Sequence, residues 1–293
     1  MRVTPAPALP AARVLAAVAL ALSMSTAISA EPVRTSFLTS DKVRLSVLEA
    51  GPAEARGPVI AFVPGWSMPG DIFRPQVEAL AVEHRVAVLD PRGQGESPVP
   101  AGGYSISRRA KDVAEFVARY PRAVLVGWSL GGLEALEAAY AHAPKSLVAL
   151  VLVDNSVGEG GAPKRRSGSI GEDLIRDREG TLDRFIRAMY RTPRPEEEIE
   201  RVKRAALRMP LHASLSIFPS KVPSSHWRAI SQGFDKPLLY AVTPQYAGQA
   251  ARLQAARPAT RVELFENAGH ALFVDEPERF NRLVAEFAAS VAR

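Results

Sequence analysis

The chain contains no cysteine. That absence excludes disulfide bonds, thiolate metal sites, a cysteine nucleophile and the lipid-modified cysteine of bacterial lipoproteins. A fold that reaches an oxidising compartment without disulfides must be held together by its hydrophobic core. The 263 residues that follow Ala30 are enough to bury such a core.

A large excess of one charge is also missing, because 37 Lys and Arg face 31 Asp and Glu, a net charge of +6. Residues 155–232 hold 15 basic and 10 acidic residues, so the positive excess gathers there. Basic and acidic side chains are mixed in this segment, for example near Glu196-Glu197-Glu198, which is typical of solvated helical faces. We therefore expect no nucleic-acid site.

Residues 1–30 lack charge except at Arg2 and Arg13, and an apolar run ending in small residues continues to Glu31. This pattern is typical of a secretory signal peptide. Only 17 residues separate Arg13 from Glu31, which is short for a membrane span, although a retained anchor stays an alternative. We expect an exported protein, periplasmic or secreted, without stable membrane insertion after cleavage.

Apolar runs rich in Val, Ile and Leu alternate with helical patterns from residue 58 onward, which predicts βαβ units and a mostly parallel sheet. Because these runs are apolar on both faces, helices must flank the sheet. An earlier stretch, 34–51, has the pattern of an antiparallel hairpin at the sheet edge. The predicted strands span 58–63, 85–90, 123–128, 147–154, 237–242 and 261–266, and the predicted helices span about 71–83, 105–119, 130–142, 246–256 and 277–291.

The interval 157–232 breaks this rhythm, because it is rich in Arg, Glu, Pro and Gly and contains helical patterns but no strand pattern. We interpret it as a helical lid inserted after the sixth strand, which is the strand at 147–154 when the two strands of the hairpin are counted. The lid would lie over the carboxyl ends of the strands. The core then has two parts, 31–156 and 233–293.

A serine stands between two glycines in the stretch Gly127-Trp128-Ser129-Leu130-Gly131. The bare Gly-x-Ser-x-Gly pattern is weak evidence, since chance supplies it in about one chain of this length in ten. Its context is specific, because a buried strand pattern ends at Trp128 and an alanine-rich helical pattern begins directly after Ser129. That arrangement is a nucleophile elbow, which raises the serine hydroxyl above the sheet. Ser129 is the predicted nucleophile, and a structural turn serine is the alternative.

A neutral serine hydroxyl needs a base within hydrogen-bond reach. Of the five histidines, only His270 follows the last predicted strand and precedes the last helix, which places it at the same sheet edge as Ser129. Developing negative charge on a substrate also needs two backbone N–H donors. We expect them at Leu130 and at Trp66, which follows the glycine turn at Gly65.

These motifs resemble the α/β-hydrolase superfamily, over roughly residues 40–293. The similar stretches are "GWSLGG", "NAGHALFVDEPERF" and "LDPRGQGES". The elbow and the lid position are similar to carboxylesterases that cleave the methyl ester of pimeloyl-carrier protein, and the size is similar to cofactor-free haloperoxidases and arylesterases. The resemblance implies a serine hydrolase without cofactor or metal, and a turn-forming role for Asp90. Pro64 stands where this superfamily often has histidine, which leaves the backbone donors in place.

The catalytic acid departs from the common pattern. Relatives usually carry it after the strand at 237–242, but no carboxylate occurs from Lys236 to Val262. Some relatives carry it after the strand that follows the elbow helix, and here that position is Asp154. Its role would be to hold the imidazole tautomer of the base. The alternative is a dyad in which Gln245, Asn155 or a carbonyl orients His270.

These predictions together favour a hydrolase that cleaves a carboxylic ester of a small molecule through an acyl-enzyme. Two other enzyme classes use the same Ser-His apparatus, namely the cofactor-free haloperoxidases or perhydrolases and the hydrolases of carbon–carbon bonds. A non-catalytic ligand-binding protein with this fold is the alternative outside enzymes.

Overall fold

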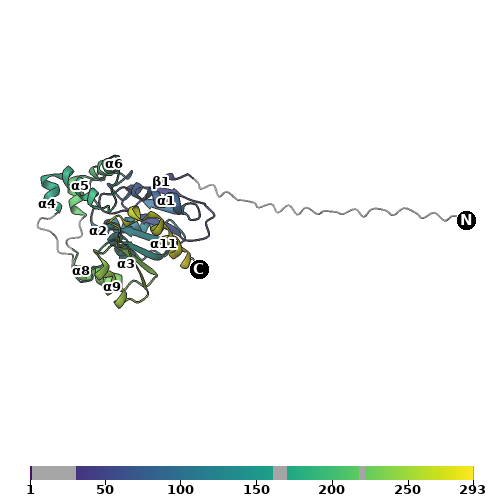
Figure 1. The fold of residues 1–293 in the computed structure, drawn as a ribbon. Helices are drawn as coiled ribbons and strands as arrows, with labels where there is room; N and C mark the ends of the chain where they lie inside the picture. Colours follow the sequence, from purple (N-terminus) through teal and green to yellow (C-terminus); the bar gives the residue numbers. More distant parts are fainter. Residues whose placement is uncertain (2–30, 161–169, 218–221, 293) are drawn as a thin grey trace.

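The computed structural model describes Met1 and residues 31–160, 170–217 and 222–292 (Figure 1). Residues 2–30 of the predicted signal peptide lie outside the described residues. Eight strands form one sheet in the order β1-β2-β4-β3-β5-β6-β7-β8. The strands are β1 (Val33–Leu38), β2 (Arg44–Ala50), β3 (Val59–Val63), β4 (Val86–Leu89), β5 (Ala123–Trp128), β6 (Leu147–Val153), β7 (Leu238–Val242) and β8 (Thr260–Leu264).

The two ends of this sheet differ in strand direction. Strands β1 and β2 form the predicted hairpin at one edge, and β2 pairs antiparallel with β4. The pairs from β4 to β8 are all parallel. This mostly parallel sheet confirms the predicted fold class, and it brings the carboxyl ends of β5, β6, β7 and β8 to the same edge.

Helices cover both faces of the sheet, as the two-sided apolar strands require. They include the short η1 (Gly70–Phe73) and α10 (Leu272–Asp275), and α1 (Arg74–Leu80), α2 (Ile106–Val117), α3 (Leu130–His142), α9 (Ala247–Ala256) and α11 (Pro277–Ser290). Alternate residues of β3 point to opposite faces. Phe62 packs in the cluster that contains α1 and α11, whereas Ala61 packs with α2, α3 and α9.

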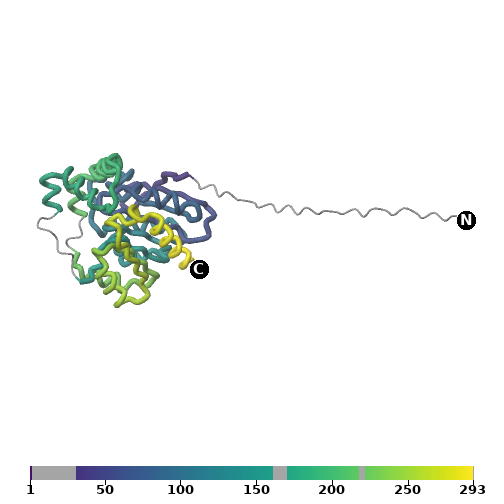
Figure 2. Tube along the Cα trace, in the orientation of Figure 1, coloured from purple at the N-terminus to yellow at the C-terminus, as the bar shows by residue number. Residues whose placement is uncertain are grey.

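In the described residues between β6 and β7 lie five more helices: α4 (Ile170–Arg176), α5 (Arg178–Ala188), α6 (Glu196–Leu207), α7 (Leu211–Ser216) and α8 (Ser224–Gln232). Helices α4 to α7 contribute their buried apolar side chains to the cluster that includes Trp66 and Met68. Helix α8 packs against α3 and α9, on the other side of the molecule (Figures 1 and 2). We call α4–α7 the insertion; that it acts as a lid stays a prediction.

Buried charges fix the turn after β4 and the pairing of α2 with α3. Asp90 accepts hydrogen bonds from the backbone N–H groups of Gly70 (2.7 Å) and Glu96 (3.0 Å), which agrees with a turn-forming role. Burial raises the pKa of Asp90. Arg109 on α2 and Glu134 on α3 form an ion pair in which neither side chain is exposed. Among the described residues, no helix is long and apolar enough to cross a membrane.

Candidate active site

The turn that carries Ser129 joins β5 directly to α3. Ser129 has φ 55° and ψ −118°, a conformation that L residues rarely adopt and that occurs at functional turns. Small neighbours are required there, because a Cβ atom at Gly127 would lie 2.5 Å from the carbonyl oxygen of Gly131. The Ser129 N–H donates to the carbonyl of Val153 (2.9 Å), which ties the turn to the end of β6.

His270 lies between β8 and α10 and contacts two of the predicted site residues. Its Nε2 atom is 2.9 Å from Ser129 Oγ, and its Nδ1 atom is 2.7 Å from Asp154 Oδ2. An ionised carboxylate only accepts hydrogen bonds, so we assign the proton to Nδ1. That tautomer leaves Nε2 free to accept the Ser129 hydroxyl proton.

Asp154 directly follows β6 and is fully buried. It adopts a left-handed conformation with φ 46°, which aspartate tolerates better than most residues. Of the other groups considered for orienting His270, the Asn155 amide donates to the carbonyl of Ser156 (3.1 Å), and Gln245 is exposed. The geometry therefore favours the carboxylate over the dyad.

Sequence reasoning missed Thr243, which holds the second oxygen of this carboxylate. Both the N–H and the hydroxyl of Thr243 donate to Asp154 Oδ1, each at 2.8 Å. Thr243 is the first residue after β7, the position at which the superfamily resemblance predicts the acid. Its position beside the end of β6 was the available signal, because neighbouring parallel strands end at one edge.

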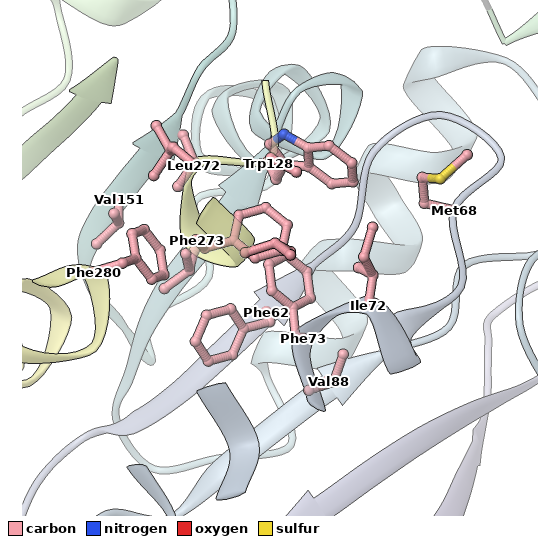
Figure 3. Packing of buried hydrophobic residues seen from close by; sticks show 14 of the residues in the cluster. Phe62, Met68, Ile72, Phe73, Val88, Trp128, Val151, Leu272, Phe273 and Phe280 are labelled. Atoms are coloured by element: carbon pink, nitrogen blue, oxygen red, sulfur yellow. The ribbon is translucent and has the colours of Figure 1, made fainter. Parts of the chain in front are cut away.

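Two aromatic residues complete the surroundings of the base. The Trp128 indole N–H donates to the backbone carbonyl of His270 (2.8 Å), and its ring packs edge-on against Phe73 and Phe273 (Figure 3). Tyr240 is buried beside Asp154, and burial raises the pKa of its phenol. The phenol stays neutral at physiological pH, so it adds no second negative charge near the carboxylate.

The residues predicted to donate to the oxyanion, Leu130 and Trp66, lie at the start of α3 and in the loop after β3. Leu130 is the first residue of α3, where a helix leaves N–H groups without intrahelical partners. Gly65, just before Trp66, approaches so closely that a Cβ atom there would lie 3.1 Å from Ser129 Cβ. The Gln94 amide donates to the carbonyls of Gly65 (3.0 Å) and Met68 (2.7 Å), which fixes the Trp66 loop.

The insertion contacts the site through Trp66. The Trp66 indole donates to the carbonyl of Ser214 on α7 (3.0 Å), and its ring meets the edge of Phe185 on α5 at a centroid distance of 5.3 Å. The Trp66 side chain thus packs against the inserted helices α5 and α7. These two contacts place α5 and α7 beside the Trp66 loop.

Titratable groups elsewhere make different contacts. His226 bonds Glu137 (2.7 Å), and His212 packs against the ring of Tyr104. The one group of potential metal ligands in the described part of the chain has carboxylate oxygens within 4.8 Å of one another, but Arg187 and Lys203 pair with its members, which are Asp183, Glu196 and Glu200. The arrangement is that of an ion-pair network on the surface of α5 and α6.

The fold and the hydrogen-bonded chain from Ser129 through His270 to Asp154 define a class, the α/β-hydrolase fold with a Ser-His-Asp arrangement at the carboxyl edge of its sheet. A model of the alpha/beta hydrolase family matches residues 60–283. The chain belongs to this family.

Individual relatives carry esterase names. A pimeloyl-[acyl-carrier protein] methyl ester esterase of Xanthomonas campestris pv. campestris is 35% identical over 135 residues, which cover 44% of this chain and 52% of that protein. The chain thus spans about half the length of this relative. The Aeromonas hydrophila protein of the same name is 29% identical over 259 residues, covering 79% of this chain and 96% of that protein. An esterase structure from Exiguobacterium antarcticum has a TM-score of 0.77 at 21% identity, over 88% of this chain and 100% of that one.

Proposed function

We propose that this protein is an exported serine esterase that hydrolyses a carboxylic ester of a small molecule through an acyl-enzyme. The observation that carries the proposal is the position of His270, 2.9 Å from Ser129 Oγ and 2.7 Å from Asp154 Oδ2. This is the geometry that a nucleophile, its base and an orienting acid require. The relatives named as methyl ester esterases support the same reaction class.

The reaction begins when Ser129 Oγ attacks the ester carbonyl and His270 Nε2 takes the hydroxyl proton. The negative charge on the carbonyl oxygen accepts hydrogen bonds from the N–H groups of Trp66 and Leu130. Collapse of the tetrahedral intermediate breaks the bond to the alcohol, which leaves with the proton from His270. Asp154 stabilises the imidazolium through Nδ1–H.

Water completes the cycle. His270 removes a proton from the water as it attacks the acyl-enzyme, and the second tetrahedral intermediate releases the carboxylic acid and restores the Ser129 hydroxyl. No external oxidant, metal or cofactor is needed for either half of the reaction.

Hydrolysis of p-nitrophenyl esters with short and medium acyl chains tests this proposal. We expect turnover by the wild type and a rate at the buffer background for Ser129→Ala. Ser146→Ala is the matched control. Ser146 is buried and precedes β6, so it lies at the amino ends of the strands, whereas Ser129 lies at their carboxyl ends. Equal rates for the wild type and Ser129→Ala would refute the enzyme function.

Export is a separate part of the proposal, supported by the uncharged run before Glu31. N-terminal sequencing of the protein recovered from periplasmic and culture fractions is the test. We expect the mature chain to begin near residue 31. Recovery of the intact N-terminus in the membrane fraction would show a retained anchor instead.

A further inference from the structure

The backbone on both sides of His270 is held by hydrogen bonds. The Gly269 N–H donates to Asp275 Oδ2 (2.8 Å), and the Ala271 N–H donates to the carbonyl of Met189 at the end of α5 (2.9 Å). The carbonyl of His270 itself accepts from Trp128 (2.8 Å). Trp128 belongs to the elbow, whereas Asp275 and Met189 do not. Met189 lies in the insertion.

Asp275 binds the insertion with the same carboxylate. Its Oδ2 atom accepts the N–H of Arg191 (2.8 Å), and its Oδ1 atom accepts the N–H (3.0 Å) and hydroxyl (2.6 Å) of Thr192. Burial raises the pKa of Asp275, but the hydrogen bonds from Thr192, Arg191 and Gly269 outweigh it and hold the pKa below the usual range. The group is therefore a carboxylate at neutral pH, and each of these bonds is charge-assisted.

The loop at 189–192 and the loop at 269–271 also touch directly. A Cβ atom at Gly269 would lie 2.6 Å from the carbonyl oxygen of Met189 and 2.8 Å from the nitrogen of Arg191. No side chain fits between the two backbones, so the contact requires glycine at 269. The loop between α5 and α6 is thus seated on the residue that precedes His270.

We propose that Asp275 is a positioning residue for His270 and that residues 189–192 of the insertion form part of the scaffold of the base. This inference rests on the proposed function, because it takes His270 as the base. It has a mechanical consequence: residues 189–192 cannot lift away without releasing the backbone of Gly269 and Ala271. Any movement of the insertion that admits substrate must therefore leave this loop seated.

The test uses Asp275→Asn, which keeps the size of the side chain but places an amide where backbone N–H groups need an acceptor. We expect kcat to fall about tenfold with KM changed less than about twofold, because misplacing a base affects the reacting geometry rather than substrate binding. Labelling of Ser129 by a fluorophosphonate should slow by a similar factor. Asp275→Glu, which retains the carboxylate, should recover part of both rates.

Hydrogen–deuterium exchange supplies a readout that is independent of activity. In Asp275→Asn the amides of 189–192 and 269–271 should exchange faster together, whereas Asp173→Asn, an exposed change on α4, should alter neither segment. Thr192→Val removes a single hydroxyl bond and should lower kcat about two- to threefold; it serves as the second variant if Asp275→Asn does not fold.

The outcomes separate this inference from the proposed function. Wild-type labelling and turnover in Asp275→Asn, or in Thr192→Val if that variant alone folds, would overturn the positioning role while leaving the esterase intact. A rise in KM with kcat unchanged would also overturn it, since the carboxylate would then shape the pocket only. Absence of Ser129-dependent turnover in the wild type would instead remove the proposed function.

Discussion

One ion pair in the sheet core and one in the insertion hold their charges in opposite ways. In the core, neither Arg109 nor Glu134 is exposed, and the pair joins α2 to α3. In the insertion, the side chains of Arg187 and Glu196 are 44% and 64% exposed. A buried pair cannot lose one member without leaving an unpaired charge in a low dielectric, whereas an exposed pair is screened by water. The Arg109–Glu134 pair of the core is therefore the less tolerant of substitution.

The same division runs through the site. Ser129, Asp154 and His270 all come from the core, at the ends of β5, β6 and β8. The insertion supplies the partners of Trp66 and the loop that seats beside His270. Substitutions in the core should therefore lower turnover or stability. Substitutions on the outer surface of the insertion should lower neither.

Asp154→Asn should give the largest effect. The amide can keep the position of the carboxylate but favours the wrong tautomer of His270, so we expect kcat to fall by about 10³–10⁴ with little change in the melting temperature. Steady-state kinetics on a p-nitrophenyl ester, with a thermal melt, checks this. Retained turnover would show that another group orients His270.

Arg109→Met should lower the free energy of unfolding and leave turnover unchanged. It leaves Glu134 buried without a partner, at a cost of about 3–5 kcal/mol in the free energy of unfolding. The double variant Arg109→Met/Glu134→Leu removes both charges and should recover most of that loss. Urea unfolding of both variants measures the difference. Equal stability for the single variant and the wild type would break the contrast between core and insertion.

Trp128→Phe should have a moderate effect on turnover. It keeps an aromatic ring against Phe273 but removes the indole donor to the carbonyl of His270, a loss of about 1 kcal/mol. We expect kcat to fall about fivefold with KM unchanged. Trp227→Phe, on α8, is the matched control and should leave kcat at the wild-type value.

Arg187→Gln should have the smallest effect. The side chain makes exposed ion pairs with Asp183 and Glu196 on the outer surface of α5 and α6. Exposed pairs of this kind contribute little and are screened by salt. We expect the melting temperature and kcat to equal those of the wild type at physiological ionic strength. A clear loss of stability would show that the surface network holds the insertion in place.

Much of the core could be predicted from the sequence, because the pattern itself carries the physical cause. Buried Val and Leu runs at 123–128 and 147–154 matched β5 and β6 to within a residue. Strands that end at one edge also explain why Ser129, Asp154 and His270 come together, although their catalytic roles stay predictions.

The remaining features depend on contacts between distant segments. Thr243 meets Asp154, and Asp275 meets Thr192, through side-chain hydrogen bonds that no periodicity encodes. Helical patterns in 157–232 predicted helices, but not which face they cover. Helix α8 packs with α3 and α9, whereas α4–α7 pack toward Trp66, and that choice depends on loop geometry.

Mass spectrometry of the protein quenched during turnover of p-nitrophenyl acetate tests the central claim most directly. If Ser129 is the nucleophile, the wild type gains one acetyl group on the peptide that contains Ser129. Asp154→Asn should gain it more slowly and Ser129→Ala not at all. Hydrolysis without any acyl group on Ser129, or the same acylation of another residue in Ser129→Ala, would contradict the account.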